Sequence, residues 1–261
     1  MQIKAKKHFG QNFLRDESVK RQIIESIPNS DKIVEIGPGL GDLTRGLLSK
    51  TKQLACFEID NELFVLLEKK FENELKSGHL ELFCKDALKS WEQISTKPYF
   101  LAANLPYYIA TNIILRALED TNCLGFVVMI QREVALKFCA NAGDSDFCAL
   151  SLLAELFGEC ELLFDVPPSA FEPQPKVVSS VIRLKKTKTL NCDIKGFENF
   201  LKIAFSTPRK TLLKNLSVST EKTLLESIFS KLNIALNIRP HELNLALFLK
   251  IFDEVRNERQ K

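Results

Sequence analysis

Short apolar runs alternate with amphipathic stretches over the first two-thirds of the 261-residue chain. Apolar runs bounded by turn residues predict buried strands, and apolar positions three or four residues apart predict helices. Strands are expected at 32–37, 53–59, 80–84, 99–104 and 124–130, and helices at 16–27, 42–50, 61–77, 111–119 and 131–139. This alternation predicts an α/β fold, a mostly parallel sheet with helices on both faces.

The last third of the chain changes character after two further predicted strands. A helix is expected at 149–157, with strands at 158–166 and 177–184. The link 166–175 holds four prolines, so it is neither helix nor central strand and is expected to be a stiff loop. Beyond residue 195 only helical patterns follow, at 196–206, 209–216, 220–232 and 242–256. The sequence therefore predicts an α/β domain at 1–184 and a small all-α domain at 185–261.

Composition restricts the class of protein. No apolar run approaches the roughly 20 residues that span a membrane, and no apolar signal core follows the basic N-terminus. The seven cysteines are irregularly spaced without a Cys-x-x-Cys pair, and the three histidines lie far apart. We therefore expect a cytoplasmic monomer without a membrane partner or a metal site, whose cysteines are reduced core residues.

Charge is distributed unevenly, although the net charge is only +3. Residues 183–261 contain 16 Lys and Arg against 8 Asp and Glu, and the first 21 residues form a second basic cluster. Basic ends around an acidic middle indicate contact with a polyanion such as nucleic acid. A solvated surface with a chance asymmetry is the alternative that charge alone leaves open.

A glycine-rich segment, Glu35-Ile36-Gly37-Pro38-Gly39-Leu40-Gly41, follows a predicted strand and opens a predicted helix. Glycines such as Gly37 and Gly39 let the backbone turn tightly and approach a nucleotide-like ligand. Glu58 ends the next strand, where a carboxylate meets the ribose hydroxyls of a nucleoside. A dinucleotide-binding dehydrogenase would share this geometry. The Gly-x-Gly-x-Gly spacing, with a Glu two residues before the first glycine, favours S-adenosylmethionine over a pyrophosphate ligand.

Asp86 follows the third predicted strand and is a second acidic candidate. Its carboxylate would accept a hydrogen bond from the exocyclic amine of a cofactor adenine. A helix N-cap is the alternative function for an aspartate in this position. The placement of Glu58 and Asp86 on successive strands favours the binding interpretation.

The segment Asn104-Leu105-Pro106-Tyr107 ends the fourth predicted strand, at the edge where open α/β sheets bind ligands. An adenine N6 amine is a poor nucleophile because its lone pair is conjugated with the ring. The Asn104 side-chain oxygen and a backbone carbonyl near Leu105 would accept its two N–H groups and aim the lone pair at a sulfonium methyl. Pro106 stiffens the turn, and Tyr107 offers a face on which the base stacks.

Phe171 lies in the proline-rich link and is the candidate for the opposite side of the base-binding site. A single Phe belongs to the core more often than to a ligand site. The flanking prolines and the adjacent Glu172 argue against a fully buried position. Both interpretations therefore stay open at this residue.

Six segments together resemble the ribosomal RNA adenine N6-dimethyltransferases, in particular their small-subunit (16S) branch. The segments are Phe9–Leu14, Glu35–Gly39, Asn104–Tyr107, Phe171–Val177, Arg209–Leu212 with Asn215–Leu216, and Ile238–Leu243. They span essentially the whole chain in the order of the family. The resemblance implies a class I, Rossmann-like methyltransferase fold with a helical RNA-binding domain.

The resemblance also implies a reaction and the residues that serve it. Methyl groups would pass from S-adenosylmethionine to N6 of two adjacent adenosines near the 3′ end of 16S rRNA, in the assembling 30S subunit, giving N6,N6-dimethyladenosine. The implied cofactor site consists of Asn12, Leu14, Gly37, Glu58, Asp86 and Asn104. Asn104, Tyr107 and Phe171 would hold the target base. Arg209, Lys210 and Lys214 of the basic helical domain would meet RNA phosphates.

Two positions depart from the family pattern, and two other functions remain open. Cys148 stands where the family usually has glycine, and the segment 207–210 has one arginine where the family usually has two. One alternative is a 23S rRNA adenine methyltransferase of the macrolide-resistance type; Pro38, Leu105 and the C-terminal segments favour the small-subunit branch. The other is a non-catalytic assembly or RNA-binding factor, against which the intact site residues argue.

Overall fold

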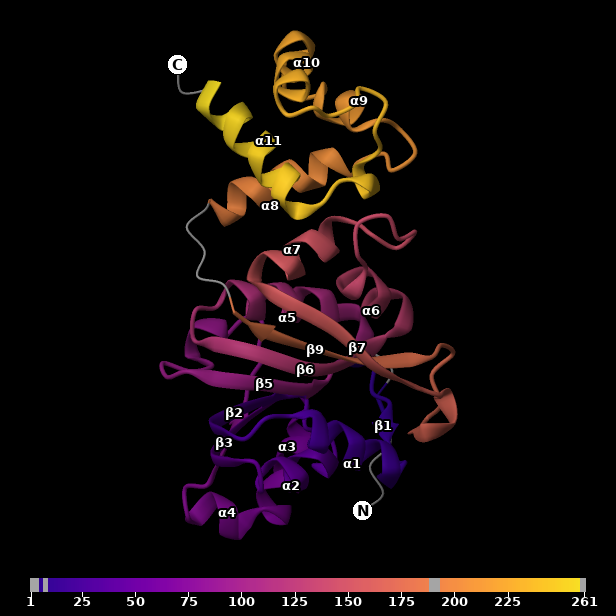
Figure 1. Ribbon diagram of the computed structural model, residues 1–261. Coiled ribbons are helices and arrows are strands. Elements are labelled where there is room, and N and C mark those ends of the chain that lie inside the picture. The colour runs from indigo at the N-terminus through magenta and orange to yellow at the C-terminus, as the bar shows by residue number, and fades with distance from the viewer. Residues whose placement is uncertain (1–4, 7–8, 188–192, 259–261) are drawn as a thin grey trace. The chain divides into compact units, whose positions relative to one another are not determined.

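The computed structural model describes residues 5–6, 9–187 and 193–258 (Figure 1). The chain divides into two compact units, which are described separately. Unit one comprises Met1–Ala135 with Cys160–Lys186, and unit two comprises Leu136–Glu159 with Thr187–Lys261. The functional division into 1–184 and 185–261 stays a prediction.

The elements follow one another in the α/β order that the sequence predicts. The strands are β1 (Phe13–Leu14), β2 (Ser30–Ile36), β3 (Thr51–Glu58), β4 (Leu80–Cys84), β5 (Tyr99–Asn104), β6 (Cys123–Gln131), β7 (Gly158–Val166), β8 (Phe171–Glu172) and β9 (Ser179–Lys186). The α-helices are α1 (Glu17–Ser26), α2 (Asp42–Leu47), α3 (Asn61–Lys70), α4 (Glu72–Lys76), α5 (Tyr107–Glu119), α6 (Arg132–Cys139), α7 (Ala149–Phe157), α8 (Ile194–Ala204), α9 (Leu212–Leu216), α10 (Lys222–Lys231) and α11 (Leu245–Glu258). Short 3₁₀ turns are η2 (Trp91–Gln93), η3 (Pro168–Ala170) and η4 (Pro240–Glu242).

Unit one is built on a seven-stranded sheet with the order β4-β3-β2-β5-β6-β9-β7. The strands from β4 to β6 run parallel, whereas β9 pairs antiparallel with β6. The chain passes outward from β2 through β3 to β4 and then returns to the other side of β2 as β5. Such a reversal is a topological switch point, and open α/β sheets bind ligands there, beyond the carboxyl ends of the strands.

Both faces of this sheet are covered. Successive residues of a strand point to opposite faces, and Ile33 and Val34 of β2 are both buried. The face of Ile33 packs against the first three helices, through residues that include Val19, Leu43 and Leu67. Figure 1 shows α5 on the opposite side of the sheet from α1, α2 and α3. The predicted mostly parallel sheet with helices on both faces is confirmed.

The helices α2 and α9 are each three residues shorter than expected, and three further differences have a clear physical reason. The helix expected at 61–77 is interrupted at Phe71, whose backbone (φ −120°, ψ 31°) leaves the helical region. The helix expected from residue 111 begins at Tyr107, because Pro106 has the fixed φ that suits a helix start. The antiparallel pair of β1 and β8 was not predicted, since two-residue strands show no periodicity.

Unit two is helical around a cluster of phenylalanine rings. Phe197 and Phe200 of α8 contact Phe252 of α11, with ring centroids 5.4 and 5.5 Å apart. The helical pattern expected beyond residue 195 is confirmed up to Glu258. Cys148 is the N-cap of α7 in extended backbone (φ −155°, ψ −172°), which any residue adopts, so this departure from glycine strains nothing.

The cysteines only partly match the expectation of small core residues. Cys56 and Cys123 are buried, but Cys84 is exposed because it ends the edge strand β4. Cys192 lies outside the described residues. Within the described ranges, no cluster of three or more His, Cys, Asp or Glu side chains is placed to hold a metal. No helix of the described chain has the length and apolarity needed to cross a bilayer.

Candidate active site

The candidate site lies in unit one, at the carboxyl ends of β2, β3 and β5. A pocket of about 750 Å³, its open mouth included, occupies this position. Its lining residues are Phe9, Gly10, Gln11, Asn12, Phe13, Leu14, Glu35, Gly37, Pro38, Gly39, Leu40, Asp42, Leu43, Glu58, Leu63, Asn104, Leu105, Pro106, Tyr107 and Phe171.

The glycine loop forms one wall of the pocket. Gly37, Gly39 and Gly41 all have positive φ angles, of 68°, 59° and 76°, which only glycine adopts without strain. A Cβ added at Gly37 would meet no atom within 4 Å. Since Gly37 lines the pocket, that space is open to a ligand, which can approach the backbone closely.

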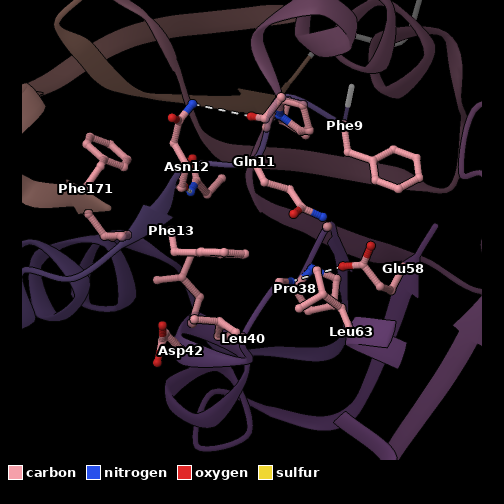
Figure 2. A pocket seen from close by; sticks show the side chains of 18 of the residues that line it. Phe9, Gln11, Asn12, Phe13, Pro38, Leu40, Asp42, Glu58, Leu63 and Phe171 are labelled. Carbon is pink, nitrogen blue, oxygen red and sulfur yellow. Dashed lines mark hydrogen bonds between the residues drawn. The ribbon is translucent and has the colours of Figure 1, made fainter. Parts of the chain in front are cut away.

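Glu58 faces the glycine loop from the end of β3 (Figure 2). One carboxylate oxygen accepts from the backbone N–H of Gly39 at 3.2 Å and the other from that of Asp60 at 2.9 Å. Each carboxylate oxygen has two lone pairs, so both keep acceptor capacity for ligand hydroxyls. Burial raises the pKa of Glu58, although these two backbone hydrogen bonds oppose the shift.

Glu35 lies beneath the loop and is only 1% exposed. Its carboxylate accepts from the Thr44 hydroxyl at 2.6 Å and from the Cys56 thiol at 3.3 Å. Burial raises the pKa of Glu35 to about 7. Its hydrogen bonds therefore tie α2 and β3 together under the pocket floor.

Asn104, the last residue of β5, has an amide whose orientation follows from its partner. Its side-chain nitrogen donates to the backbone carbonyl of Asn12 at 3.3 Å. A carbonyl only accepts, so this contact requires the NH₂ group and leaves the side-chain oxygen of Asn104 as an acceptor for a ligand. That acceptor is the group required to hold an amine N–H.

The two residues after Leu105 turn the chain from β5 into α5. Pro106 is the N-cap of α5, and Tyr107 is its first residue. The Tyr107 hydroxyl is hydrogen-bonded to the buried Ser179 side chain at 2.7 Å, which holds the ring at one orientation against β9. Burial raises the pKa of Tyr107, so the phenol is neutral at physiological pH.

Phe171 lines the pocket but is only 4% exposed. The expectation that its flanking prolines keep it from full burial is therefore wrong. The reason is the unpredicted pairing of β8 with β1, which places Phe171 opposite Leu14 and packs it against the core. Its part in base binding stays a prediction.

The segment 9–14 forms the second wall of the pocket and is held by a buried carboxylate. Asp60 accepts from the Lys6 ammonium at 2.7 Å and from the Gln11 side-chain amide at 2.9 Å, and the Lys6 backbone N–H donates to Gln11 at 2.8 Å. Burial raises the pKa of Asp60, but these hydrogen bonds outweigh it and hold the pKa below its usual value. Sequence reasoning missed this network, because no motif links residues so far apart.

Asp86 is the one predicted cofactor residue that does not line this pocket. Its carboxylate accepts from the backbone N–H groups of Leu88 at 3.0 Å and Lys89 at 3.3 Å. These bonds resemble those of the helix N-cap that the sequence left open, but they close the turn 87–90, and no helix starts there. Because Asp86 follows the carboxyl end of β4, which lies next to β3, it still lies at the carboxyl-end edge of the sheet, as the pocket does.

The three predicted RNA-binding residues belong to unit two. Arg209 and Lys210 are exposed in the loop before α9, and Lys214 is exposed on α9 itself. The buried Asn215 amide fixes this loop by donating to the carbonyls of Ala204 at 2.7 Å and Thr207 at 3.1 Å. The cations therefore project from an anchored segment.

These features together define a class of protein. A parallel sheet whose glycine loop and buried carboxylate flank a switch-point pocket is the class I, Rossmann-like methyltransferase fold that binds S-adenosylmethionine. The Gly37 space and the spare acceptor capacity of Glu58 fit such a nucleoside ligand.

Comparison with known proteins identifies the family. A family model described as ribosomal RNA adenine dimethylase matches residues 2–257. The chain therefore belongs to the ribosomal RNA adenine dimethylase family and is an S-adenosylmethionine-dependent rRNA methyltransferase. It is 58% identical over 262 residues to the ribosomal RNA small subunit methyltransferase A of Campylobacter fetus, covering 99% of this chain and 98% of that protein.

Further relatives agree with this assignment. The methyltransferase of the same name from Campylobacter jejuni is 51% identical over 260 residues, which cover 98% of this chain and 97% of the relative. A dimethyladenosine transferase from Plasmodium falciparum superposes with a TM-score of 0.82 at 26% identity, covering 94% of this chain and 98% of that one. The 23S rRNA methyltransferase ErmE shares the fold, with a TM-score of 0.73 at 23% identity and coverage of 94% and 100%.

Proposed function

We propose that this protein transfers methyl groups from S-adenosylmethionine to N6 of two adjacent adenosines near the 3′ end of 16S rRNA, giving N6,N6-dimethyladenosine. The observation that carries the proposal is the Asn104 side-chain oxygen, left as a free acceptor at the pocket by the bond between its amide and Asn12. The relatives named for the small ribosomal subunit support the choice of RNA.

The cofactor would lie along the glycine loop. Gly37 and Gly39 would let the cofactor approach the protein backbone closely, and Glu58 would accept hydrogen bonds from the ribose hydroxyls of the cofactor. Asn12 and Leu14 of the segment 9–14, together with Asn104 at the end of β5, would enclose the cofactor on the other side. Both backbone bonds of Asp86 go to Oδ1, so its Oδ2 would keep acceptor capacity for the adenine amine. When bound, S-adenosylmethionine supplies an electrophilic methyl group on a sulfonium.

The chain's own groups would prepare the adenine amine. The Asn104 oxygen and a carbonyl near Leu105 would accept the two N–H groups, so that the nitrogen lone pair turns out of conjugation. Tyr107 and Phe171 would hold the base between their rings. The nitrogen lone pair would form the new N–C bond while the bond between the methyl carbon and sulfur breaks, its electron pair staying on sulfur. The methylated nitrogen would then lose its proton to water. For the second methyl group only one N–H remains, and the Asn104 oxygen still suffices to orient it.

The substrate is rRNA of the assembling 30S subunit, and the exposed Arg209, Lys210 and Lys214 would contact its phosphates. This partner supports a cytoplasmic location. The proposed reaction uses no metal ion and no membrane, and we infer that the protein acts as a monomer. The target base must leave its stack to enter the pocket, at a cost of a few kcal/mol.

The test presents purified protein and methyl-labelled cofactor to small subunits and, separately, to large-subunit rRNA. We expect label in dimethyladenosine of small-subunit RNA alone. Label found only in large-subunit RNA would establish the 23S alternative. Binding to small subunits without any label would support a non-catalytic assembly factor.

A further inference from the structure

Tyr108 is an aromatic side chain that the site described above does not use. The chain has three tyrosines. Tyr99 is fully buried and Tyr107 is held by Ser179, whereas Tyr108 is 60% exposed. Large aromatic side chains usually bury most of their area, so an exposed ring next to a ligand pocket indicates a binding surface.

The position of the Tyr108 ring is set by its neighbours. It lies on the first turn of α5, directly after Tyr107. A Cβ added at Gly10 would stand 3.3 Å from this ring, so the ring covers the backbone of Gly10 and leaves its remaining surface to solvent. Gly10 and Pro106 both line the pocket. Tyr108 therefore stands at the pocket's rim.

Two further exposed apolar residues lie on the segment that leads into β9. Val177 and Val178 are 42% and 37% exposed and immediately precede Ser179. The bond from Ser179 to Tyr107 brings this segment to the start of α5. Val178 is held in place by its carbonyl, which accepts from the backbone N–H of Arg132 at 3.0 Å.

We propose that the Tyr108 ring forms the surface on which the base next to the target adenosine stacks, with the exposed Val177 and Val178 on the segment that Ser179 joins to Tyr107. This inference rests on the proposed function. A base that enters the pocket leaves its neighbour with one face unstacked, and an exposed aromatic ring replaces that contact. Because the two target adenosines are adjacent, each is the neighbour of the other. A purine covers more of the ring than a pyrimidine does, so this surface selects a purine beside the target.

The test is a double-mutant cycle between the protein and its RNA. Tyr108→Ala should raise the KM for small subunits by roughly 5- to 150-fold, as loss of one stacked base does. Tyr108→Phe should keep near wild-type values, because the ring remains. Leu124→Ala is the matched control. The Leu124 side chain is 48% exposed, but it lies near the amino end of β6, whereas the pocket lies at the carboxyl ends of the parallel strands. It should change neither KM nor cofactor affinity.

The second arm replaces the neighbouring adenosine of the substrate with uridine. In the wild type this replacement should raise KM, and in Tyr108→Ala it should add little, because the two partners act together. A fully additive result would overturn the inference, since it would assign Tyr108 a structural role alone. Wild-type kinetics in Tyr108→Ala would overturn it too. If the wild-type protein itself leaves small subunits unmethylated, the proposed function fails first.

Discussion

Two glycines with similar φ angles allow the role of the glycine loop in cofactor binding to be measured separately from its effect on stability. Gly37 (φ 68°) lines the pocket, and Gly78 (φ 74°) lies in a turn after α4, away from it. An added Cβ meets nothing within 4 Å at either position. An alanine at each position therefore carries only the cost of left-handed backbone, about 1–2 kcal/mol.

This cost predicts equal stability and unequal binding. Gly37→Ala and Gly78→Ala should each lower Tm by about 2–8 °C, since 1 kcal/mol corresponds to roughly 2–4 °C in a chain of this size. Only in Gly37→Ala does the methyl group fill space that the cofactor needs. An overpacked contact costs about 1–3 kcal/mol, so the Kd for S-adenosylmethionine should rise on the order of tenfold.

The assay is isothermal titration calorimetry of the cofactor, with thermal unfolding of each variant without ligand. Gly78→Ala supplies the control for backbone strain. Wild-type affinity in Gly37→Ala would refute the assignment of this loop as the cofactor wall. Equal losses of affinity in both variants would show that strain acts globally and would refute the local argument.

Three further predictions concern charge. Burial raises the pKa of Glu35 from 4.5 to about 7, so between these two pH values the folded state keeps a proton that the unfolded state releases. The free energy of unfolding should therefore fall as pH rises from 4.5 to about 7, by at most about 3 kcal/mol. Glu35→Gln should flatten that slope in urea unfolding at pH 5 and pH 8, and an unchanged slope would contradict the assignment. Asp60→Asn cannot accept from both of its side-chain donors, so it should loosen the segment 9–14 and weaken cofactor binding severalfold by calorimetry; an unaltered Kd would show that the network is irrelevant to the pocket. Reversing the charges of Arg209 and Lys210 should weaken RNA binding and its salt dependence while sparing cofactor affinity, and equal losses would instead indicate misfolding.

The long periodic elements could be predicted from the sequence because their apolar patterns are local. The strands from β2 to β6 lie within two residues of their expected bounds, since each is a buried run ending at a turn or a polar residue. The glycine loop and the segment from Asn104 were placed at the correct edge, because parallel strands direct their carboxyl ends the same way. The periodicity of the strands and their order along the chain were therefore sufficient to place the glycine loop and the segment from Asn104.

The remainder depends on contacts between distant residues. No local pattern reveals that Asp60 holds Lys6 and Gln11, or that Tyr107 bonds to Ser179. The burial of Phe171 follows from the pairing of two-residue strands, which carry no periodic signal. Asp86 shows the converse, because its bonds to the backbone of Leu88 and Lys89 are local and are of the kind that an aspartate makes at a cap or a turn.

The most direct test of the account is mass spectrometry of 16S rRNA from cells that lack this protein and carry either the wild-type gene or Asn104→Ala. The wild type should restore N6,N6-dimethyladenosine at the two adjacent positions. The variant should leave both adenosines without dimethylation while it still binds small subunits, because it removes the acceptor for the amine and the bond to Asn12 but leaves the proposed RNA-binding residues intact. Full dimethylation with Asn104→Ala would contradict the role assigned to this residue and the chemistry built on it.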